Sequence, residues 1–175
     1  MVRAHPGVFP TMAPTPKIDP QHLWRAPEPI VLLPHDPSWL VDAAEECRRI
    51  AHACAPFVIR VEHIGSTSIP GLIAKPILDL MPLVRSVDDA LACVEPMRAL
   101  GYRHAGESGI PGRQYFVKGS PRTHHAHMLV EGSREAVRHR AVRDALRADP
   151  LLAARYAALK RELAARFADN RDAYA

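Results

Sequence analysis

One short stretch of the sequence combines the residue types that can bind phosphate. Gly65-Ser66-Thr67-Ser68 directly follows residues 57–64, which are mostly apolar and β-branched. A glycine lets the backbone approach a ligand closely, and the hydroxyl groups of Ser66 and Thr67 can then act with backbone N–H groups on phosphate oxygens. The stretch is a candidate phosphate-binding turn. The alternative is an ordinary Gly-Ser-Thr turn without a ligand.

A single acid, Asp79, interrupts the apolar run at residues 77–84. A run of this kind is typical of a strand in the interior of a sheet, where an unpaired carboxylate is costly to bury. Asp79 should therefore bind a cation, take part in catalysis, or form a buried ion pair, for which Lys75 is the nearest candidate.

Two histidines share one face of another predicted strand. His125 and His127 are two residues apart, so their side chains point the same way and could bind a divalent metal ion or a phosphate together. The alternative is a polar strand at the edge of the protein. Residues 111–130 contain Arg113, Lys118 and Arg122 but no acid, which favours an anion because guanidinium groups bind phosphate through two hydrogen bonds.

Glu107 lies next to Gly106 and close to Gly109. It could supply a third acid to the site, or it could be a solvated loop residue. The candidate metal ligands are therefore Asp79, His125, His127 and Glu107.

Helices and strands alternate along the chain and would position these residues. Asp36 is expected to cap a helix that has Pro37 as its first residue and runs to about residue 53. The further predicted elements are an edge strand at 30–33, strands at 57–64, 77–84, 114–118 and 124–130, and helices at 88–100, 133–148 and 150–168. The order predicts an α/β or α+β fold with a C-terminal helical pair. The hairpin-like pair at 114–130 favours a mixed sheet with flanking helices.

Length and composition narrow the class of protein. The 175 residues favour one domain at 30–175, preceded by a proline-rich segment at 1–29 that should be extended or disordered. No apolar run approaches the roughly 18 residues of a membrane span, and no secretory signal is visible, so a cytoplasmic protein is expected. The three cysteines lack CxxC spacing, which argues against a disulfide framework.

The net charge of +4 comes mainly from arginines near the C-terminus. They are mixed with acids on predicted helices, a pattern typical of a solvated face. No basic stripe with interleaved aromatic residues is present, so sequence-specific nucleic-acid binding is not expected. The oligomeric state is left open.

Several motifs together resemble the GrpB family, over residues 30–175. They are Glu62-His63-Ile64-Gly65-Ser66-Thr67-Ser68-Ile69-Pro70-Gly71-Leu72, Ala74-Lys75-Pro76-Ile77-Leu78-Asp79, Tyr115-Phe116-Val117-Lys118, Thr123-His124-His125-Ala126-His127, Arg143-Asp144-Ala145-Leu146-Arg147 and Tyr156-Ala157-Ala158-Leu159-Lys160-Arg161-Glu162-Leu163. This uncharacterised family also occurs fused to dephospho-CoA kinase.

The resemblance implies a nucleotidyltransferase-like fold of the polymerase-β type. Such enzymes carry Gly-Ser on a turn and, one strand later, Asp-x-Asp or Asp-x-Glu, whose two carboxylates hold divalent metal. Gly65, Ser66 and Asp79 match this layout, but Met81 stands where the second acid belongs. The residues that could replace the missing ligand are Glu62, Glu107, His125 and His127.

These observations give one leading hypothesis. The chain would be a metal-dependent nucleotidyl- or phosphoryl-transfer enzyme that uses a nucleoside triphosphate, a small-molecule acceptor and Mg²⁺ or Mn²⁺, with Zn²⁺ as another option. Its catalytic residues would be Asp79, His125 and His127, and its phosphate-binding residues Gly65, Ser66, Thr67, Lys75, Arg113, Lys118 and Arg122. The alternatives are a non-catalytic module for a nucleotide or CoA-like ligand, and a metal-dependent hydrolase or ligase.

Overall fold

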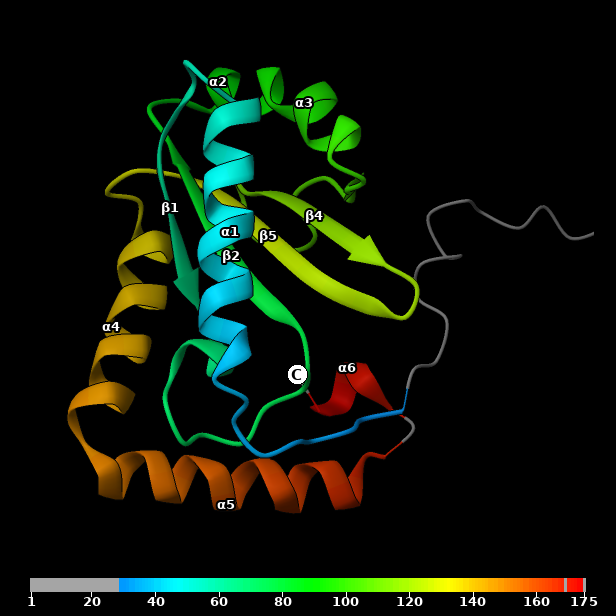
Figure 1. Cartoon of the computed structure of the whole chain (residues 1–175), viewed down its shortest axis with the longest axis vertical. Helices are drawn as coiled ribbons and strands as arrows, with labels where there is room; N and C mark the ends of the chain where they lie inside the picture. The colour runs from blue at the N-terminus through cyan, green and yellow to red at the C-terminus, as the bar shows by residue number, and fades with distance from the viewer. Residues whose placement is uncertain (1–28, 169, 175) are drawn as a thin grey trace, which may run out of the picture.

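A five-stranded mixed sheet lies at the centre of the chain (Figure 1). The structure is a computed structural model that describes residues 29–168 and 170–174, so the prediction for residues 1–29 falls outside it except at residue 29. The strands lie in the order β1-β2-β5-β4-β3. They are β1 (Val58–Ile64), β2 (Leu78–Val84), β3 (Arg103–His104), β4 (Gln114–Gly119) and β5 (Arg122–Val130).

The predicted mixed sheet is confirmed by the strand directions. β2 and β5 are parallel, whereas β1 with β2, β4 with β5 and β3 with β4 are antiparallel. The parallel pair is the one that matters for the site, because it joins strands that are far apart in the sequence. The predicted edge strand at 30–33 is reduced to a single bridge between Leu33 and Ala74.

Helices cover both faces of the sheet. They are α1 (Ser38–Ala53), the short 3₁₀ helix η2 (Ser66–Ser68), α2 (Val87–Ala92), α3 (Val94–Ala99), α4 (Arg134–Ala148), α5 (Pro150–Arg166) and α6 (Arg171–Tyr174). On one face α1 buries Trp39, Ala43 and Ile50 against a core that includes Leu80 and Phe116. On the other face α4 covers a smaller cluster, and α5 crosses the end of the sheet (Figure 1).

The first predicted helix begins one residue later than expected, and the helix predicted at 88–100 is divided into two. α1 starts at Ser38, and the Asp36 carboxylate accepts the Ser38 N–H at 2.9 Å. The helix predicted at 88–100 is divided at Cys93, because Pro96 has no N–H to donate to the carbonyl group one turn earlier. The C-terminal helical pair is confirmed as α4 and α5, and Asp149 caps α5 by accepting the N–H groups of Leu151 and Leu152.

Arg140 and Arg143 of α4 are partly buried, whereas the other arginines of this helix lie on the solvated face that the sequence suggested. Arg140 Nε and Arg143 Nη1 donate to the two carboxylate oxygens of Glu62 on β1, at 2.9 and 2.8 Å. Arg140 also pairs with Glu131 at 2.8 Å. These ion pairs hold α4 against the sheet, so part of the C-terminal positive charge is structural.

Among the described residues, none of the helices combines the length and apolarity required to traverse a membrane.

Glu46 of α1 forms a nearly buried ion pair with Lys118 of β4. Lys118 Nζ lies 2.7 Å from the carboxylate, and the two side chains are 20% and 5% exposed. Burial acts to raise the pKa of Glu46, but the hydrogen bond and charge of Lys118 outweigh it and hold that pKa below its usual value. The pair therefore stabilises the fold above about pH 4.5, and the contribution is lost as the pH falls further.

Lys118→Met should lower the free energy of unfolding by on the order of 3 kcal/mol at pH 7, because Glu46 stays buried and charged. Urea unfolding at pH 7 and pH 4 measures this, and the cost should shrink at pH 4 as Glu46 becomes protonated. Arg49→Met is the matched control. Arg49 contacts the same carboxylate at 2.8 Å but is 47% exposed, so its loss should cost below about 1 kcal/mol. Equal costs for the two variants would contradict the prediction.

Candidate functional site

Asp79, His125 and His127 converge on one face of the sheet. The parallel pairing of β2 and β5 places Asp79 directly opposite His125, and His127 follows on the same face. The Asp79 Oδ1 atom lies 3.1 Å from His125 Nδ1 and 3.5 Å from His127 Nε2. The side chains are 29%, 12% and 14% exposed. One ligand atom from each residue lies within 4.8 Å of the others, so the three could hold a metal ion.

The Asp79 carboxylate is held in its charged form. Burial acts to raise its pKa, but the hydrogen bonds from His125 and His127 outweigh it and keep the pKa well below the usual value. Tyr115 of β4 packs against both imidazole rings, with centroid distances of 5.5 and 5.1 Å. The acid is therefore ionised at neutral pH, and aromatic packing fixes the two rings beside it.

Gly65 brings the predicted phosphate-binding turn against this carboxylate. Its φ angle is +67°, and a Cβ atom added there would lie 2.4 Å from Asp79 Oδ2. Such a contact is far inside van der Waals distance, so only glycine lets the end of β1 approach Asp79 this closely. The turn and the acid, which are 14 positions apart in the sequence, thus form one unit.

Lys160 of α5 binds the turn directly, although it lies 94 positions further along the sequence. Its Nζ donates to Ser66 Oγ at 2.8 Å and to the Ile73 carbonyl at 2.9 Å. The residue is 7% exposed and has no acidic partner among the described residues. Burial, together with nearby Lys75, lowers the pKa of Lys160 to about 8. The sequence analysis missed this residue, although it lies in one of the stretches that resemble the GrpB family.

Thr67 points into the protein. It is 1% exposed, its hydroxyl donates to the Ile77 carbonyl at 3.4 Å, and its oxygen lies 2.9 Å from His63 Nε2. Burial lowers the pKa of His63 to about 4, so the ring is neutral and can donate this hydrogen bond. Thr67 and His63 therefore hold the turn in place from within.

Arg113 orients His127. Its Nε and Nη2 donate to the carbonyl groups of Glu107 and Ser108 at 3.1 and 2.6 Å, and Nη1 lies 3.2 Å from His127 Nδ1. Because a guanidinium group only donates, Nδ1 of His127 accepts and the proton of the neutral ring is on Nε2, facing Asp79. Metal binding through Nε2 would require that proton to leave and Arg113 to shift. Arg113 is 7% exposed and has no acidic partner among the described residues.

His139 of α4 is a further residue that the sequence analysis missed. Its ring lies 5.2 Å from the ring of His127, and its Nε2 is buried without a hydrogen-bond partner in the described part of the chain. Burial lowers the pKa of His139 to about 4. The ring borders a cavity of about 190 Å³ that Gly65 and Ser66 also line. A polar ligand in this cavity could form a hydrogen bond with His139 Nε2.

The side chains of the other predicted site residues have different partners. The Glu107 carboxylate accepts the Gly112 N–H at 2.7 Å within its own loop. Lys118 is opposite His124 rather than His125, so it faces α1 on the other side of the sheet. Arg122 is opposite Gly119 at the hairpin turn, and Lys75 Nζ lies 4.7 Å from the ring centre of Tyr174.

Met81 occupies the core and not the site. It is fully buried below α4, with Ile64, Leu83, Leu129 and Ala136 around it. The strand β2 therefore offers a single acid, and the nearest additional donors are the two histidines on β5. A methionine thioether cannot replace a carboxylate as a ligand for a hard cation such as Mg²⁺.

The fold and the site together define an α/β protein with a mixed sheet, two C-terminal helices and an acid–histidine cluster that could bind a metal ion. The family model described as GrpB protein matches residues 29–175, and the chain belongs to this family. The resemblance inferred from the sequence is confirmed.

Several relatives agree with this assignment. UPF0157 protein YqkA of Bacillus subtilis is 42% identical over 154 residues, which are 87% of this chain and 45% of YqkA. UPF0157 protein PA4798 of Pseudomonas aeruginosa is 39% identical, over 91% of this chain and 67% of that protein. The crystal structure of conserved protein GrpB from Enterococcus faecalis has a TM-score of 0.78 and 36% identity, over 82% of this chain and 88% of that one.

A segment of this domain also occurs in a larger protein. Dephospho-CoA kinase of Mycobacterium bovis is 40% identical over 77 residues, which are 42% of this chain and 19% of the kinase. This chain thus spans less than half the length of YqkA and matches a small part of the kinase.

Gly65→Ala should lower the free energy of unfolding by about 2–5 kcal/mol, the sum of backbone strain and the clash with Asp79. If the cluster holds Mn²⁺, as the sequence predicts, the variant should also abolish that binding, because the carboxylate must move. Gly132→Ala is the matched control, since its φ is +78° and a Cβ there meets nothing within 4 Å. That variant should cost about 1–2 kcal/mol and keep its Mn²⁺ affinity. Urea unfolding and titration with Mn²⁺ measure both effects; equal losses in the two variants would exclude a special role for Gly65.

Proposed function

We propose that this chain is a metal-dependent enzyme with a nucleotidyltransferase-like fold, which transfers a nucleotidyl or phosphoryl group to a small-molecule acceptor. The observation that carries the proposal is the contact between the Gly65 turn and the Asp79 carboxylate. It brings a phosphate-binding turn and a metal-binding acid together, as phosphoryl transfer requires.

The residues around this contact fit a phosphate ligand and one metal ion. Asp79, His125 and His127 would hold the ion, which when bound would neutralise charge on the phosphate oxygens. Ser66 and Lys160 would bind the phosphate from the turn, and the buried cation of Arg113 would add favourable potential. Lys160 and Arg113 both lack acidic partners among the described residues, so their charge is available to an anion.

The histidine ligands favour a particular choice of metal. Imidazole nitrogen suits Mn²⁺ and Zn²⁺ better than Mg²⁺, which prefers an all-oxygen environment. Among the described residues the cluster contains one carboxylate, since Met81 stands in the core where a second acid was expected. We therefore favour Mn²⁺ or Zn²⁺.

Protein purified without a histidine tag should bind one equivalent of Mn²⁺ or Zn²⁺ and bind Mg²⁺ at least ten-fold more weakly. His125→Ala and His127→Ala should each weaken binding strongly, since each removes one of three ligands. His52→Ala is the control, because His52 lies at the end of α1, away from the cluster. Elemental analysis and calorimetric titration measure the stoichiometry and affinity. Unchanged binding in both cluster variants would show that the ion lies elsewhere.

Nucleoside triphosphate should bind in the presence of Mn²⁺, and Asp79→Asn should weaken this binding at least ten-fold and abolish turnover. Asp88→Asn makes the same change at an exposed acid of α2 and should leave both unchanged. Calorimetry gives the affinity, and phosphate or pyrophosphate release with a metabolite pool gives the turnover. Absence of nucleotide binding with either metal would overturn the proposal.

A non-catalytic role is the second candidate, and the burial of Met81 is the observation that favours it. A site without the second acid could bind a nucleotide or CoA-like ligand and leave it unchanged. In that case the ligand would bind without being consumed, and Asp79→Asn would leave its affinity unaltered. The same calorimetric and turnover measurements thus separate the two candidates.

A further inference from the structure

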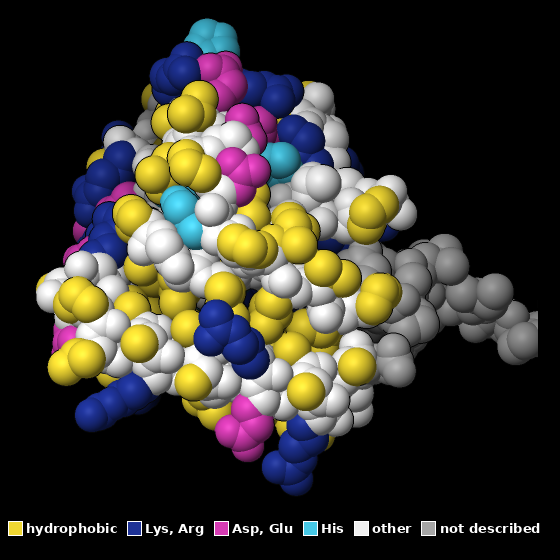
Figure 2. Space-filling model, turned by 60° about the horizontal axis from the view of Figure 1, so that its bottom comes forward, with side chains coloured by type: hydrophobic (Ala, Val, Ile, Leu, Met, Phe, Trp, Pro, Cys, Tyr) yellow, Lys and Arg dark blue, Asp and Glu magenta, His cyan; other side chains and the backbone are white. Residues whose placement is uncertain are grey.

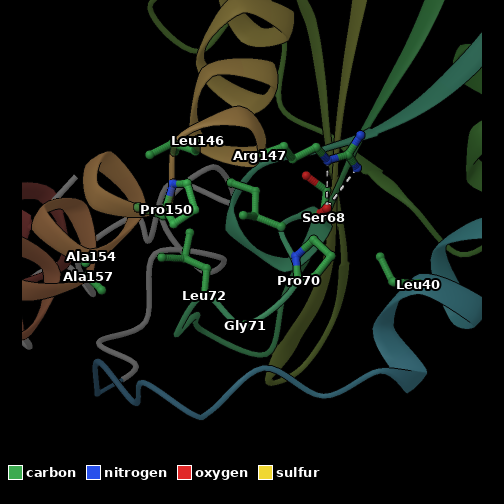
Figure 3. Close-up of a pocket in the computed structure, with 12 residues that line it drawn as sticks. Leu40, Ser68, Pro70, Gly71, Leu72, Leu146, Arg147, Pro150, Ala154 and Ala157 are labelled. Atoms are coloured by element: carbon green, nitrogen blue, oxygen red, sulfur yellow. Dashed lines mark hydrogen bonds between the residues drawn. The ribbon is translucent and has the colours of Figure 1, made fainter.

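A second, larger hollow lies beside the candidate site. It is a groove of about 590 Å³ between helices α4 and α5 and the loop that follows η2 (Figure 3). Its size is in the range of small-molecule sites, which is roughly 300–1,000 Å³. Apolar side chains form most of its walls, among them Pro70 and Leu72 from the loop, Leu146 from α4 and Ala154 and Ala157 from α5.

Helix α5 carries further exposed apolar residues. Figure 2 shows apolar side chains over much of the face that α5 forms. Leu151 and Leu159 of this helix are 73% and 48% exposed. Apolar surface of this extent is typical of a place where something binds.

Arg147 supplies the groove with one positive charge. Its Nε and Nη2 both donate to the Ser68 carbonyl, at 3.1 and 2.8 Å, and Figure 3 shows this pair of bonds at the groove wall. No carboxylate of the described residues forms an ion pair with Arg147, and Nη1 has no bond to a described acceptor. An apolar groove with a single available cation is complementary to a molecule with an apolar arm and one anionic group.

The groove and the candidate site share a wall. Ile69 and Leu146 line both this groove and the 190 Å³ cavity beside Gly65, Ser66 and His139. The shared wall means that one molecule passing over these two side chains would reach both hollows. Ser68 strengthens the connection, because its hydroxyl donates to the Gly65 carbonyl at 2.7 Å.

We propose that the groove binds the apolar arm of an amphiphilic small molecule whose carboxylate or phosphate pairs with Arg147. The claim that this molecule is the acceptor rests on the proposed function, since its other end would then lie in the cavity beside Gly65. Binding in the groove itself does not depend on transfer activity and can be tested alone.

The test uses the full chain and octyl phosphate as the probe, below its micelle-forming concentration. Calorimetry should show binding at least ten-fold tighter than for octanol, which lacks the charge, and for inorganic phosphate, which lacks the chain. Arg147→Gln should reduce the affinity for octyl phosphate to that for octanol. Arg147→Lys should recover part of the loss, because it keeps the charge.

Ala154→Trp should fill the groove and weaken octyl phosphate binding at least ten-fold. Ala158→Trp is the matched control. It lies one turn further along α5, is exposed, and does not line the groove, so the affinity should not change. Equal binding by the Ala154→Trp and Ala158→Trp variants would overturn the proposal. Octanol binding as tightly as octyl phosphate would also overturn the proposal, because it would show that the anionic group does not contribute to binding.

Two further measurements keep the outcomes apart. Sedimentation of the unmodified chain and of Ala154→Trp shows whether the groove is a contact between two copies; a dimer lost in that variant would overturn the small-molecule proposal. Titration with Mn²⁺ and a nucleoside triphosphate tests the proposed function on the same samples. Octyl phosphate binding without nucleotide binding would support the groove proposal and overturn the proposed transfer function. Nucleotide binding without octyl phosphate binding would support the transfer function and overturn the groove proposal.

Discussion

The parallel pairing of β2 with β5 is the constraint on which the site depends. It sets Asp79 opposite His125 and brings together residues 46 positions apart in the sequence. A shift of one residue in this pairing would turn His125 and His127 to the other face of the sheet. The register is fixed by burial on both faces, since Leu80 and Met81 alternate between two separate cores. The packing of ordinary apolar residues therefore determines the geometry of the polar cluster.

Two groups of partly or fully buried cations among the described residues differ in their partners. Arg140, Arg143 and Lys118 pair with buried or half-buried carboxylates and hold helices against the sheet. Arg113 and Lys160, in contrast, are buried against neutral carbonyl, hydroxyl or imidazole groups. Burying a cation without a counter-charge is costly. The second group lies around the Asp79 cluster and the turn, which is where an anion would recover that cost.

Local patterns were sufficient to predict the main elements. Alternation and apolar runs located β1, β2, β4 and β5 to within two residues, and the capping signal at Asp149-Pro150 located the start of α5. The two-residue strand β3 has no such pattern, because its place is set by pairing with β4. The division of the helix at Cys93 was encoded by Pro96, but periodicity of the apolar residues concealed it.

The site was only partly visible in the sequence for a different reason. Gly65, Asp79 and the histidine pair were predicted as site residues because each breaks the local pattern, as a glycine at a strand end or a polar residue in an apolar strand. Lys160 does not break any pattern, since lysine is common on helices. Its role follows from a contact across 94 residues, and a single sequence contains no local record of such a contact.

That contact couples helix α5 energetically to the turn. If an anion binds at Ser66, as proposed, the free energy of binding would be shared with the docking of α5, and linkage of this kind is reciprocal. A substitution that weakens the packing of α5 would therefore lower the affinity for the ligand, and a bound ligand would stabilise the packing of α5. The stability of the α5 contact with the rest of the domain would then report whether the turn is occupied.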